Sequence, residues 1–381
     1  MSEAQSIIMN TTDPLKKRLN NTTSMKIWGK VMIQKGLVVA VIFLFIGVCM
    51  IPSATSGQIK DLKQTNSKAF ITVDDEPGDA DFTSIKEAVN ASSPGDTIEV
   101  YSGTYPEDGI LLRKDNVSLL GVSHELGEGN DSGQPFIKGN GIDTVIKIDA
   151  SHVVVSNFTI ENPETETLFT AGIFVNHIPS YEQNNITISE CVITNSSHTG
   201  IYVTYTRDNI RIIGNHISHC FLHGIAIMAY SPVSSFVIIG NVITECRDSG
   251  ISFDGHDHQN VSFNRISNCK MGIEFGADNT IVYGNDIENC SLGIRCGGVR
   301  NIFTKNNFKN YSRIGFWFQK YLLWPWKNKW IGNYWDTWKG SGPKTILGFV
   351  YLDLYGEWIR FIFLFPWVEF DWHPVKEPYD I

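Results

Sequence analysis

The sequence lacks an excess of basic residues and the short motifs that mark several enzyme classes. Its 381 residues hold 31 Lys and Arg against 40 Asp and Glu, a formal net charge of −9, which argues against nucleic-acid binding through a basic patch. The chain contains no phosphate-binding loop, nucleotide fingerprint, G-x-S-x-G or H-E-x-x-H motif. Glycine (33) and proline (14) stay far below collagen or linker content, and 42% hydrophobic residues are enough for a packed core.

Long hydrophobic runs are scarce, and the one near the start is short. Residues 36–50 (GLVVAVIFLFIGVCM) are uncharged, follow three lysines and precede a stretch of small residues. This is the layout of a secretory signal peptide, and the run is shorter than the ~18–20 residues that span a bilayer. We expect residues 25–56 to be a signal peptide or an N-terminal membrane anchor, preceded by an extension over residues 1–24 that a start at Met25 would leave out.

Either interpretation of the N-terminal segment places residues 57–381 outside the cytoplasm, secreted or at the cell surface. Nine N-x-Ser/Thr sequons between Asn90 and Asn310 agree with a glycoprotein at that address. Residues 57–68 are expected to be a linker, and the N-terminal segment is a possible point of membrane contact.

A repeat of about 22 residues governs the middle of the chain. Glycine followed by an apolar residue recurs at 172, 200, 224, 250, 272, 293 and 315, and short alternating β-branched segments lie between turn residues. Short strands at this period, with no helix between them, indicate a parallel β-helix. We predict an all-β fold with a single-stranded parallel β-helix of about ten coils over residues 69–320.

Three columns of the repeat have a physical interpretation. The asparagines are expected to form a ladder of stacked amides at one corner, at the ~4.8 Å strand spacing. The cysteines are expected to be buried free thiols, because this spacing exceeds the ~3.8 Å between Cβ atoms of a disulfide. The glycines are expected to supply a positive φ at a corner. The columns are Asn215, Asn241, Asn264, Asn285 and Asn306 for the amides, and Cys220, Cys246, Cys269 and Cys290 for the thiols.

The two ends of the repeat differ from its middle. Ser84 and Glu87 form a capping box for a short helix that would cover the first coil, and residues 97–101 (TIEVY) are predicted to be the first strand. Nine of the ten tryptophans lie at or after Trp317. We expect residues 321–381 to form an aromatic-rich C-terminal cap, because a solenoid end must be covered. A sugar-binding platform and a membrane-interface anchor are the alternatives for this region.

The chain resembles archaeal NosD-like proteins of the pectate-lyase fold. The resemblance rests on DFTSIKEAV and SPGDTIEVYSGTY at the start, on the N-x-I-x-x-C and G-I repeats, and on GNYWDTW and VEFDWHPVKEPYDI at the end, and it spans roughly residues 70–381. It implies a right-handed β-helix of three-sheet coils, a surface or periplasmic address, and an association with carbohydrate binding or hydrolysis. It also implies a copper-binding accessory role, although no copper ligand can be carried over residue by residue.

One outer sheet face gathers the candidate catalytic and substrate-binding residues. By parity after the repeat glycines, Tyr202, Glu274, Arg295 and Trp317 point outward in one row and Asp254 in the next. Asp254 and Glu274 would then lie roughly 8 Å apart between Cα atoms, on neighbouring coils. The catalytic hypothesis assigns Asp254, Glu274 and Arg295 to a polysaccharide lyase or glycoside hydrolase, with Tyr202 and Trp317 binding substrate. The alternative is an ordinary cross-strand ion pair between Glu274 and Arg295.

The best metal candidate is the corner segment of His256, Asp257 and His258. In extended backbone, His-x-His projects both imidazoles to one side, where they could meet a copper or zinc ion. A solvated polar turn is the alternative. Pectate lyases of this fold use calcium held by clustered acids, and the outward rows show no acids stacked in neighbouring coils. Copper and calcium are the cofactors to test, and the sequence establishes neither.

The sequence thus predicts a secreted or surface-anchored β-helix that binds extracellular polysaccharide or glycan, or serves a structural role in the cell envelope. It favours a protein without enzymatic activity. The lyase or hydrolase hypothesis and the NosD-like copper-handling hypothesis stay open beside it.

Overall fold

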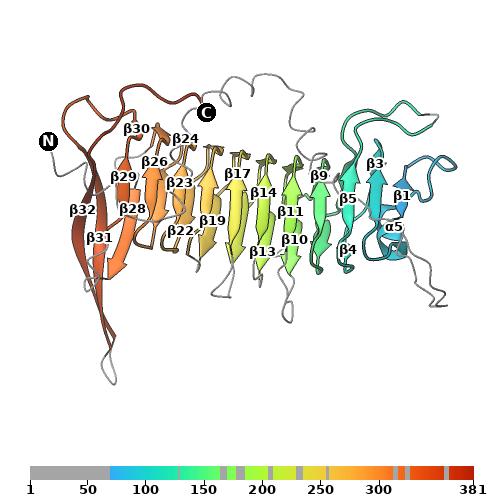
Figure 1. Cartoon of the computed structure of the whole chain (residues 1–381), viewed down its shortest axis with the longest axis horizontal. Coiled ribbons are helices and arrows are strands. Elements are labelled where there is room, and N and C mark those ends of the chain that lie inside the picture. The colour runs from blue at the N-terminus through green and yellow to red at the C-terminus, as the bar shows by residue number, and fades with distance from the viewer. Residues whose placement is uncertain are drawn as a thin grey trace, which may run out of the picture. The chain divides into compact units, whose positions relative to one another are not determined.

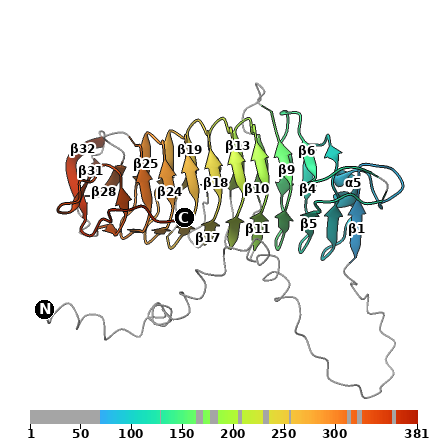
Figure 2. The same ribbon diagram turned by 90° about the horizontal axis from the view of Figure 1, so that it is seen from above.

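The computed structural model describes residues 69–127, 129–163, 170–176, 185–204, 209–228, 235–254, 257–311, 316–321, 327–355 and 360–381. The extension, signal peptide or anchor, and linker predicted for residues 1–68 lie outside this part. Within it the fold is a parallel β-helix of about nine turns, which confirms the predicted class. The coils stack along one axis, as Figures 1 and 2 show. No helix in the described part is long and apolar enough to cross a membrane.

Each full coil contributes one strand to each of three parallel sheets, here called A, B and C. Sheet A contains β1 (Phe70–Val73), β2 (Thr97–Val100), β5 (Ser118–Gly121), β8 (Val154–Ser156), β11 (Ile186–Ser189), β14 (Ile210–Ile213), β17 (Phe236–Ile239), β20 (Asn260–Ser262), β23 (Ile281–Tyr283), β26 (Ile302–Thr304) and β29 (Lys329–Ile331).

Sheet B contains β3 (Thr104–Tyr105), β6 (Phe136–Lys138), β9 (Thr159–Glu161), β12 (Val192–Thr194), β15 (His216–Ser218), β18 (Val242–Thr244), β21 (Arg265–Ser267), β24 (Asp286–Glu288), β27 (Asn307–Lys309) and β30 (Tyr334–Trp335). Sheet C contains β4 (Ile110–Leu112), β7 (Ile146–Ile148), β10 (Ala171–Asn176), β13 (Thr199–Thr204), β16 (Ile225–Met228), β19 (Ser249–Asp254), β22 (Met271–Phe275), β25 (Leu292–Cys296) and β28 (Phe316–Tyr321).

The N-terminal end is closed by the predicted helix, α5 (Ile85–Ala91), which contacts β1, β2 and β4. Ser84 caps it by accepting a hydrogen bond from the backbone N–H of Glu87 at 3.2 Å. The apolar side of the helix, with Ile85 and Val89, is buried. One strand precedes the predicted first strand, since β1 pairs in parallel with β2. The sequence TIEVY therefore forms the second strand of sheet A.

The C-terminal end is closed by a long antiparallel hairpin of β31 (Lys344–Tyr355) and β32 (Arg360–Asp371). Strand β31 pairs with β28 and β32 with β29, so the hairpin joins sheets C and A. Trp330 stacks on Phe303 with ring centroids 3.9 Å apart, and Trp335 packs on Phe308 at 4.5 Å. Both tryptophans are buried, so they continue the core of the helix and cover its last coils.

The asparagine column forms the ladder that the repeat predicts. Each side-chain Nδ2 donates to Oδ1 of the asparagine one coil further on, at 2.9–3.0 Å, and each backbone N–H donates to the same oxygen. The side chains are fully buried, so these bonds satisfy polar groups that would otherwise be costly to bury. The ladder runs through Asn215, Asn241, Asn264, Asn285, Asn306 and Asn333.

The repeat glycines have a different role from the positive φ expected of them. At Gly250 an added Cβ would lie 2.4 Å from Ile266 Cγ2 and 2.9 Å from the carbonyl oxygen of Gly272. Glycine is therefore required for space, because the next coil and the isoleucine column leave no room for a methyl group. Residues with positive φ lie at other corners, and most of those that are not glycine are asparagine, such as Asn268 and Asn289. The positive-φ expectation is wrong for Gly172, Gly200, Gly224, Gly250 and Gly272.

Candidate functional site

A continuous row of side chains runs along the outer face of sheet C. Parallel pairing in register brings one residue from each strand into this row, as the sequence parity predicts. We call it the sheet C row. Its members are Leu111, Lys147, Phe174, Tyr202, Ala226, Ser252, Glu274, Arg295 and Trp317.

Two aromatic side chains stack within the sheet C row. The rings of Phe174 and Tyr202 lie 5.3 Å apart between centroids, with an angle of 16° between their planes. Both side chains are half-buried, so part of each ring faces solvent. Tyr202 was expected from the sequence, whereas Phe174 was not. The same rule finds it, because Phe174 lies two residues after the repeat glycine Gly172.

Further along the row, Glu274 forms an ion pair with Arg295 of the next coil. The second carboxylate oxygen of Glu274 accepts a hydrogen bond from Ser249 Oγ at 3.0 Å. Both carboxylate oxygens of Glu274 therefore have a partner. The side chain of Arg295 is 44% exposed. This is the cross-strand ion pair that the sequence analysis gave as the alternative to a catalytic role.

Asp254 lies at the end of β19, one position after Phe253, which pairs with Phe275. Its carboxylate turns toward the next coil, where Oδ1 occupies the space beside Gly276. An added Cβ at Gly276 would lie only 2.2 Å from this oxygen. Asp254 and Glu274 therefore belong to neighbouring strands of one face, offset by two residues. The side chain of Trp317 lies outside the described part, although its backbone pairs with Arg295.

Two histidines lie just before repeat glycines on sheet C. His223 is buried, and its Nδ1 accepts from the backbone N–H of Ser249 at 3.4 Å. Burial lowers the pKa of His223, and burial together with nearby His223 lowers the pKa of His198. Both imidazoles are therefore neutral near pH 7, and His198 lies beside the ring of Tyr202 at 6.3 Å between centroids.

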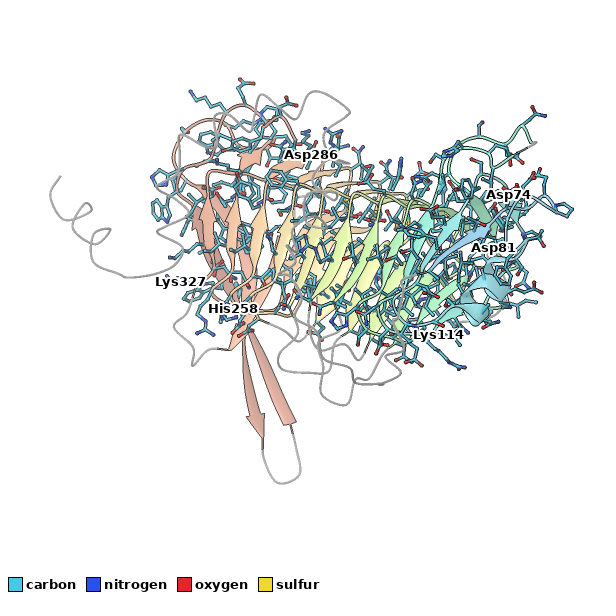
Figure 3. All side chains as sticks on the ribbon, turned by 45° about the vertical axis from the view of Figure 1, so that its right-hand side comes forward. Asp74, Asp81, Lys114, His258, Asp286 and Lys327 are labelled. Atoms are coloured by element: carbon cyan, nitrogen blue, oxygen red, sulfur yellow. The ribbon has the colours of Figure 1, made fainter. Side chains whose placement is uncertain are left out.

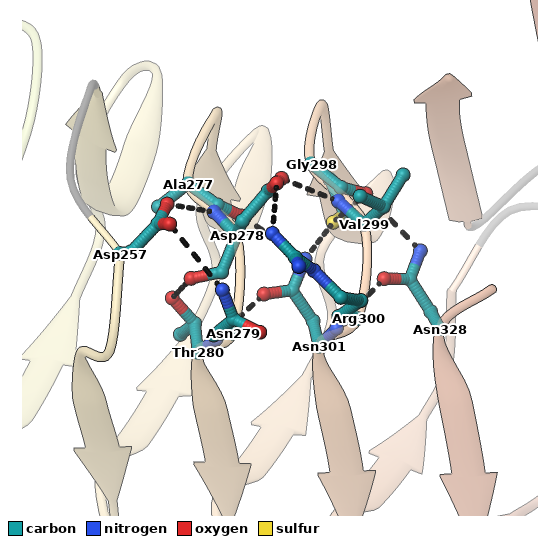
Figure 4. A network of polar contacts seen from close by, with 11 residues as sticks. Asp257, Ala277, Asp278, Asn279, Thr280, Gly298, Val299, Arg300, Asn301 and Asn328 are labelled. Atoms are coloured by element: carbon teal, nitrogen blue, oxygen red, sulfur yellow. Dashed lines mark hydrogen bonds and ion pairs between the residues drawn. The ribbon is translucent and has the colours of Figure 1, made fainter. Parts of the chain in front are cut away.

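The predicted metal corner is described only in part, since His256 lies outside the described residues. The carboxylate of Asp257 accepts hydrogen bonds from the backbone N–H of Asp278 at 3.1 Å and from Asn279 Nδ2 at 3.3 Å. Figure 4 shows these contacts in a network that continues to Arg300 and Asn328. His258 is exposed in a positive-φ conformation. Asp257 thus has a structural role at the corner, whatever His256 and His258 bind.

A family model described as periplasmic copper-binding protein (NosD) matches residues 89–340. The match covers most of the β-helix, from helix α5 to the C-terminal cap. The chain belongs to the NosD family. A comparison with curated proteins finds no match.

Solved structures similar to this NosD family member are β-helix proteins of low sequence identity. The GH136 lacto-N-biosidase from Eubacterium ramulus has a TM-score of 0.54 and 15% identity over 69% of this chain and 60% of its own. Tailspike protein 2 from Escherichia coli O157:H7 bacteriophage CAB120 has a TM-score of 0.48 and 14% identity, over 70% of this chain and 36% of its own. The chain thus spans less than two thirds of either protein, and the first likeness supports the fold.

The description of the NosD family implies copper. Protein copper sites are built from imidazole nitrogen and from cysteine or methionine sulfur. In the part of the chain that the structure describes, the groups of three or more ligand side chains within 4.8 Å of one another contain only Asp and Glu. The column cysteines are buried in the core and donate to backbone carbonyls. The described residues therefore do not fit copper.

Proposed function

We propose that the sheet C row binds an extended extracellular polysaccharide or glycan. The observation that carries this proposal is the stacked Phe174–Tyr202 pair in line with the Glu274–Arg295 ion pair. A pair of partly exposed aromatic rings followed by charged hydrogen-bonding groups suits a ligand with apolar patches and many hydroxyls. The family description as periplasmic and the fold shared with a lacto-N-biosidase support this class of ligand.

The geometry favours a linear ligand. Five strand spacings of about 4.8 Å separate Phe174 from Arg295, so the row extends over roughly 24 Å in a straight line. Between the aromatic and charged ends lie the buried side chain of Ala226 and the half-buried side chain of Ser252. The net charge of −9 repels polyanions, and Arg295 is already paired with Glu274. A neutral polysaccharide is therefore the preferred substrate class.

The test is affinity electrophoresis of the full chain through gels that contain neutral or acidic polysaccharides. Tyr202→Ala and Phe174→Ala are expected to weaken binding of the preferred polymer about tenfold, equivalent to roughly 1.4 kcal/mol. Tyr283→Ala is the matched control, because Tyr283 packs edge-to-face on Phe263 at 5.1 Å on sheet A. Retardation that both row variants leave unchanged would overturn the proposal. Absence of any retardation would favour a structural role in the envelope.

A catalytic role for Asp254 and Glu274 is a second candidate, supported by their position on neighbouring strands of one face. Arg295 would then bind the substrate beside them. The test is the release of new chain ends from the bound polysaccharide by the wild type and by Asp254→Ala and Glu274→Ala. Release that the variants lose would support a lyase or glycoside hydrolase. Binding without release would support a binding protein.

Copper handling is a third candidate, supported by family membership. The proposed ligands are His256 and His258, with Asp257 between them. Copper titration of the full chain, compared with His256→Ala and His258→Ala, tests it by calorimetry. Stoichiometric copper binding by the wild type that both variants lose would support the role. Equal copper binding by the wild type and the variants would show that this corner is not the copper site.

A further inference from the structure

Five carboxylates gather at the N-terminal end of the β-helix, far from the sheet C row. Asp74, Asp75 and Glu76 directly follow strand β1, and Glu125 and Asp131 come from the segment between β5 and β6. Ligand oxygens of the first three lie within 4.8 Å of one another, as do those of Glu76, Glu125 and Asp131. Figure 3 shows Asp74 at this end of the molecule. We call these five residues the acidic cluster.

The side chain of Asp74 is the strongest sign of a ligand site, because it is fully buried and lacks a hydrogen-bond partner. Its exposed fraction is 0%, and neither carboxylate oxygen has a partner in the described part of the chain. One oxygen each of Asp75 and Glu76 is also buried without a partner. A buried carboxylate costs several kcal/mol unless it is paired or binds a metal ion. Four buried, unpartnered oxygens from three consecutive residues thus have the character of a cation-binding site.

No lysine or arginine of the described residues forms an ion pair with these carboxylates. Burial and the charges of Glu125, Glu76, Asp75 and Asp79 raise the pKa of Asp74 to about 7. The neighbouring acids therefore repel one another in the absence of a counterion. This repulsion is the electrostatic property of a site that a divalent ion would neutralise.

The backbone around the acidic cluster leaves room for the carboxylates. An added Cβ at Gly103 would lie 1.9 Å from Asp75 Oδ1, and one at Gly129 would lie 2.3 Å from the Cδ atom of Glu125. Asp75 is further fixed by the backbone N–H of Thr104, which donates to its Oδ2 at 2.9 Å. This hydrogen bond fixes the orientation of the Asp75 carboxylate, including its unpartnered Oδ1.

We propose that the acidic cluster binds a calcium ion. The ligand set is oxygen only, which suits a hard cation and excludes a copper preference. Calcium–oxygen distances of 2.3–2.6 Å place two ligands of one ion at most about 5 Å apart, and the ligand oxygens within each of the two groups are close enough to share an ion. The ion would connect the end of β1 to the segment that carries Glu125 and Asp131, and so fasten the first coils together.

The experiment uses the full chain, treated with a chelator and titrated with calcium chloride by calorimetry at pH 7.5, with thermal unfolding in parallel. We expect calcium to bind and to raise the unfolding temperature, with magnesium binding at least tenfold more weakly. Asp74→Asn and Glu125→Gln are expected to lose at least tenfold in calcium affinity. Glu87→Gln, on the exposed side of α5, removes a charge at the same end and should bind as the wild type does.

The variants replace acids by amides of similar size, and circular dichroism verifies that each is folded. Wild-type protein that neither binds calcium nor unfolds at a higher temperature in its presence would overturn the proposal. Calcium binding that Asp74→Asn and Glu125→Gln both retain would also overturn it, as would magnesium binding as tight as calcium binding.

Discussion

Asn333 donates two hydrogen bonds to one oxygen of Asp371. Its backbone N–H lies 2.9 Å from Asp371 Oδ2, and its side-chain Nδ2 lies 3.0 Å from the same atom. Trp335 Nε1 donates to this oxygen as well, at 3.1 Å. Asp371 is fully buried in β32, so the C-terminal hairpin supplies the last acceptor of the asparagine ladder. Two residues earlier in β32, Glu369 accepts from Trp330 Nε1 at 2.8 Å.

Asp371→Ala is therefore expected to destabilise the protein by about 3 kcal/mol or more, because it leaves buried donors of Asn333 and Trp335 without an acceptor. Urea unfolding followed by tryptophan fluorescence measures the loss. Glu377→Gln is the control, since Glu377 is an exposed acid in the same terminal segment. A loss below about 1 kcal/mol for Asp371→Ala would show that the hairpin does not depend on this contact.

Gly250→Ala and Gly240→Asn separate the two roles that glycine plays in this fold. The added methyl group at Gly250 would meet Ile266 and the next coil, so we expect a loss of about 2–3 kcal/mol from overpacking. Gly240 has φ +69° and open space around its Cα, and asparagine tolerates this conformation. Gly240→Asn should therefore change stability by less than about 1 kcal/mol. Equal effects in thermal unfolding would contradict the assignment of Gly250 to a spacing role.

The buried thiols should be unreactive in the folded protein. Burial raises the pKa of Cys191 and Cys296 to about 12 each, from an ordinary value of 9.0. All six cysteine sulfur atoms are buried, so an aromatic disulfide reagent at pH 8 cannot reach them in the folded protein and should modify them only after denaturant is added. Above pH 9 the unfolded chain releases these thiol protons and the folded chain keeps them. Stability should therefore fall as pH rises from about 9 to 12.

Rapid modification of any of the six in native buffer would contradict the buried position of the column. A disulfide found by mass spectrometry under non-reducing conditions would do so as well. The number of cysteines that the reagent modifies is compared before and after reduction of the denatured protein.

The pH dependence of the metal-free protein follows from Asp74. Its pKa is raised from 3.8 to about 7 by burial and by Glu125, Glu76, Asp75 and Asp79. Between these values the folded chain holds a proton that the unfolded chain releases, so this contribution to stability is lost as pH rises toward 7. In chelator, the unfolding temperature should therefore decrease between pH 5 and pH 8. Asp74→Asn should flatten this dependence, and an unchanged slope in that variant would contradict the assignment.

Much of the fold follows from the period of the sequence. The ladder from Asn215 to Asn306, the sheet C row and the capping of α5 by Ser84 all depend on spacings that repeat or on a local motif. The stacking of one coil on the next turns a sequence period directly into a contact. The roles of Asp254, Glu274 and Arg295 in catalysis stay predictions. The strand register shows that these residues share one face of the sheet, and it does not show that they catalyse a reaction.

The remaining features depend on contacts that the period does not encode. Asp371 contacts Asn333 through a hairpin outside the repeat. The charge of Glu125, in the segment after β5, acts on Asp74 at the end of β1, and no repeated spacing relates these two residues. A periodic glycine such as Gly250 has the same sequence signature whether it supplies conformation or space, so its role was assigned wrongly. Phe174 obeys the spacing rule that identifies Tyr202 and could have been predicted from it.

The asparagine ladder has a direction. The backbone N–H and the side-chain Nδ2 of each asparagine donate to the Oδ1 of the next asparagine toward the C-terminus, and Nδ2 also donates to a backbone carbonyl of the preceding coil. Asp371, whose carboxylate accepts without donating, takes the last place in this series. A coil inserted or removed between Asn215 and Asn333 leaves both ends unchanged. Duplication of a coil within this stretch would therefore lengthen the β-helix, and the sheet C row with it, while the contacts at both ends stay the same.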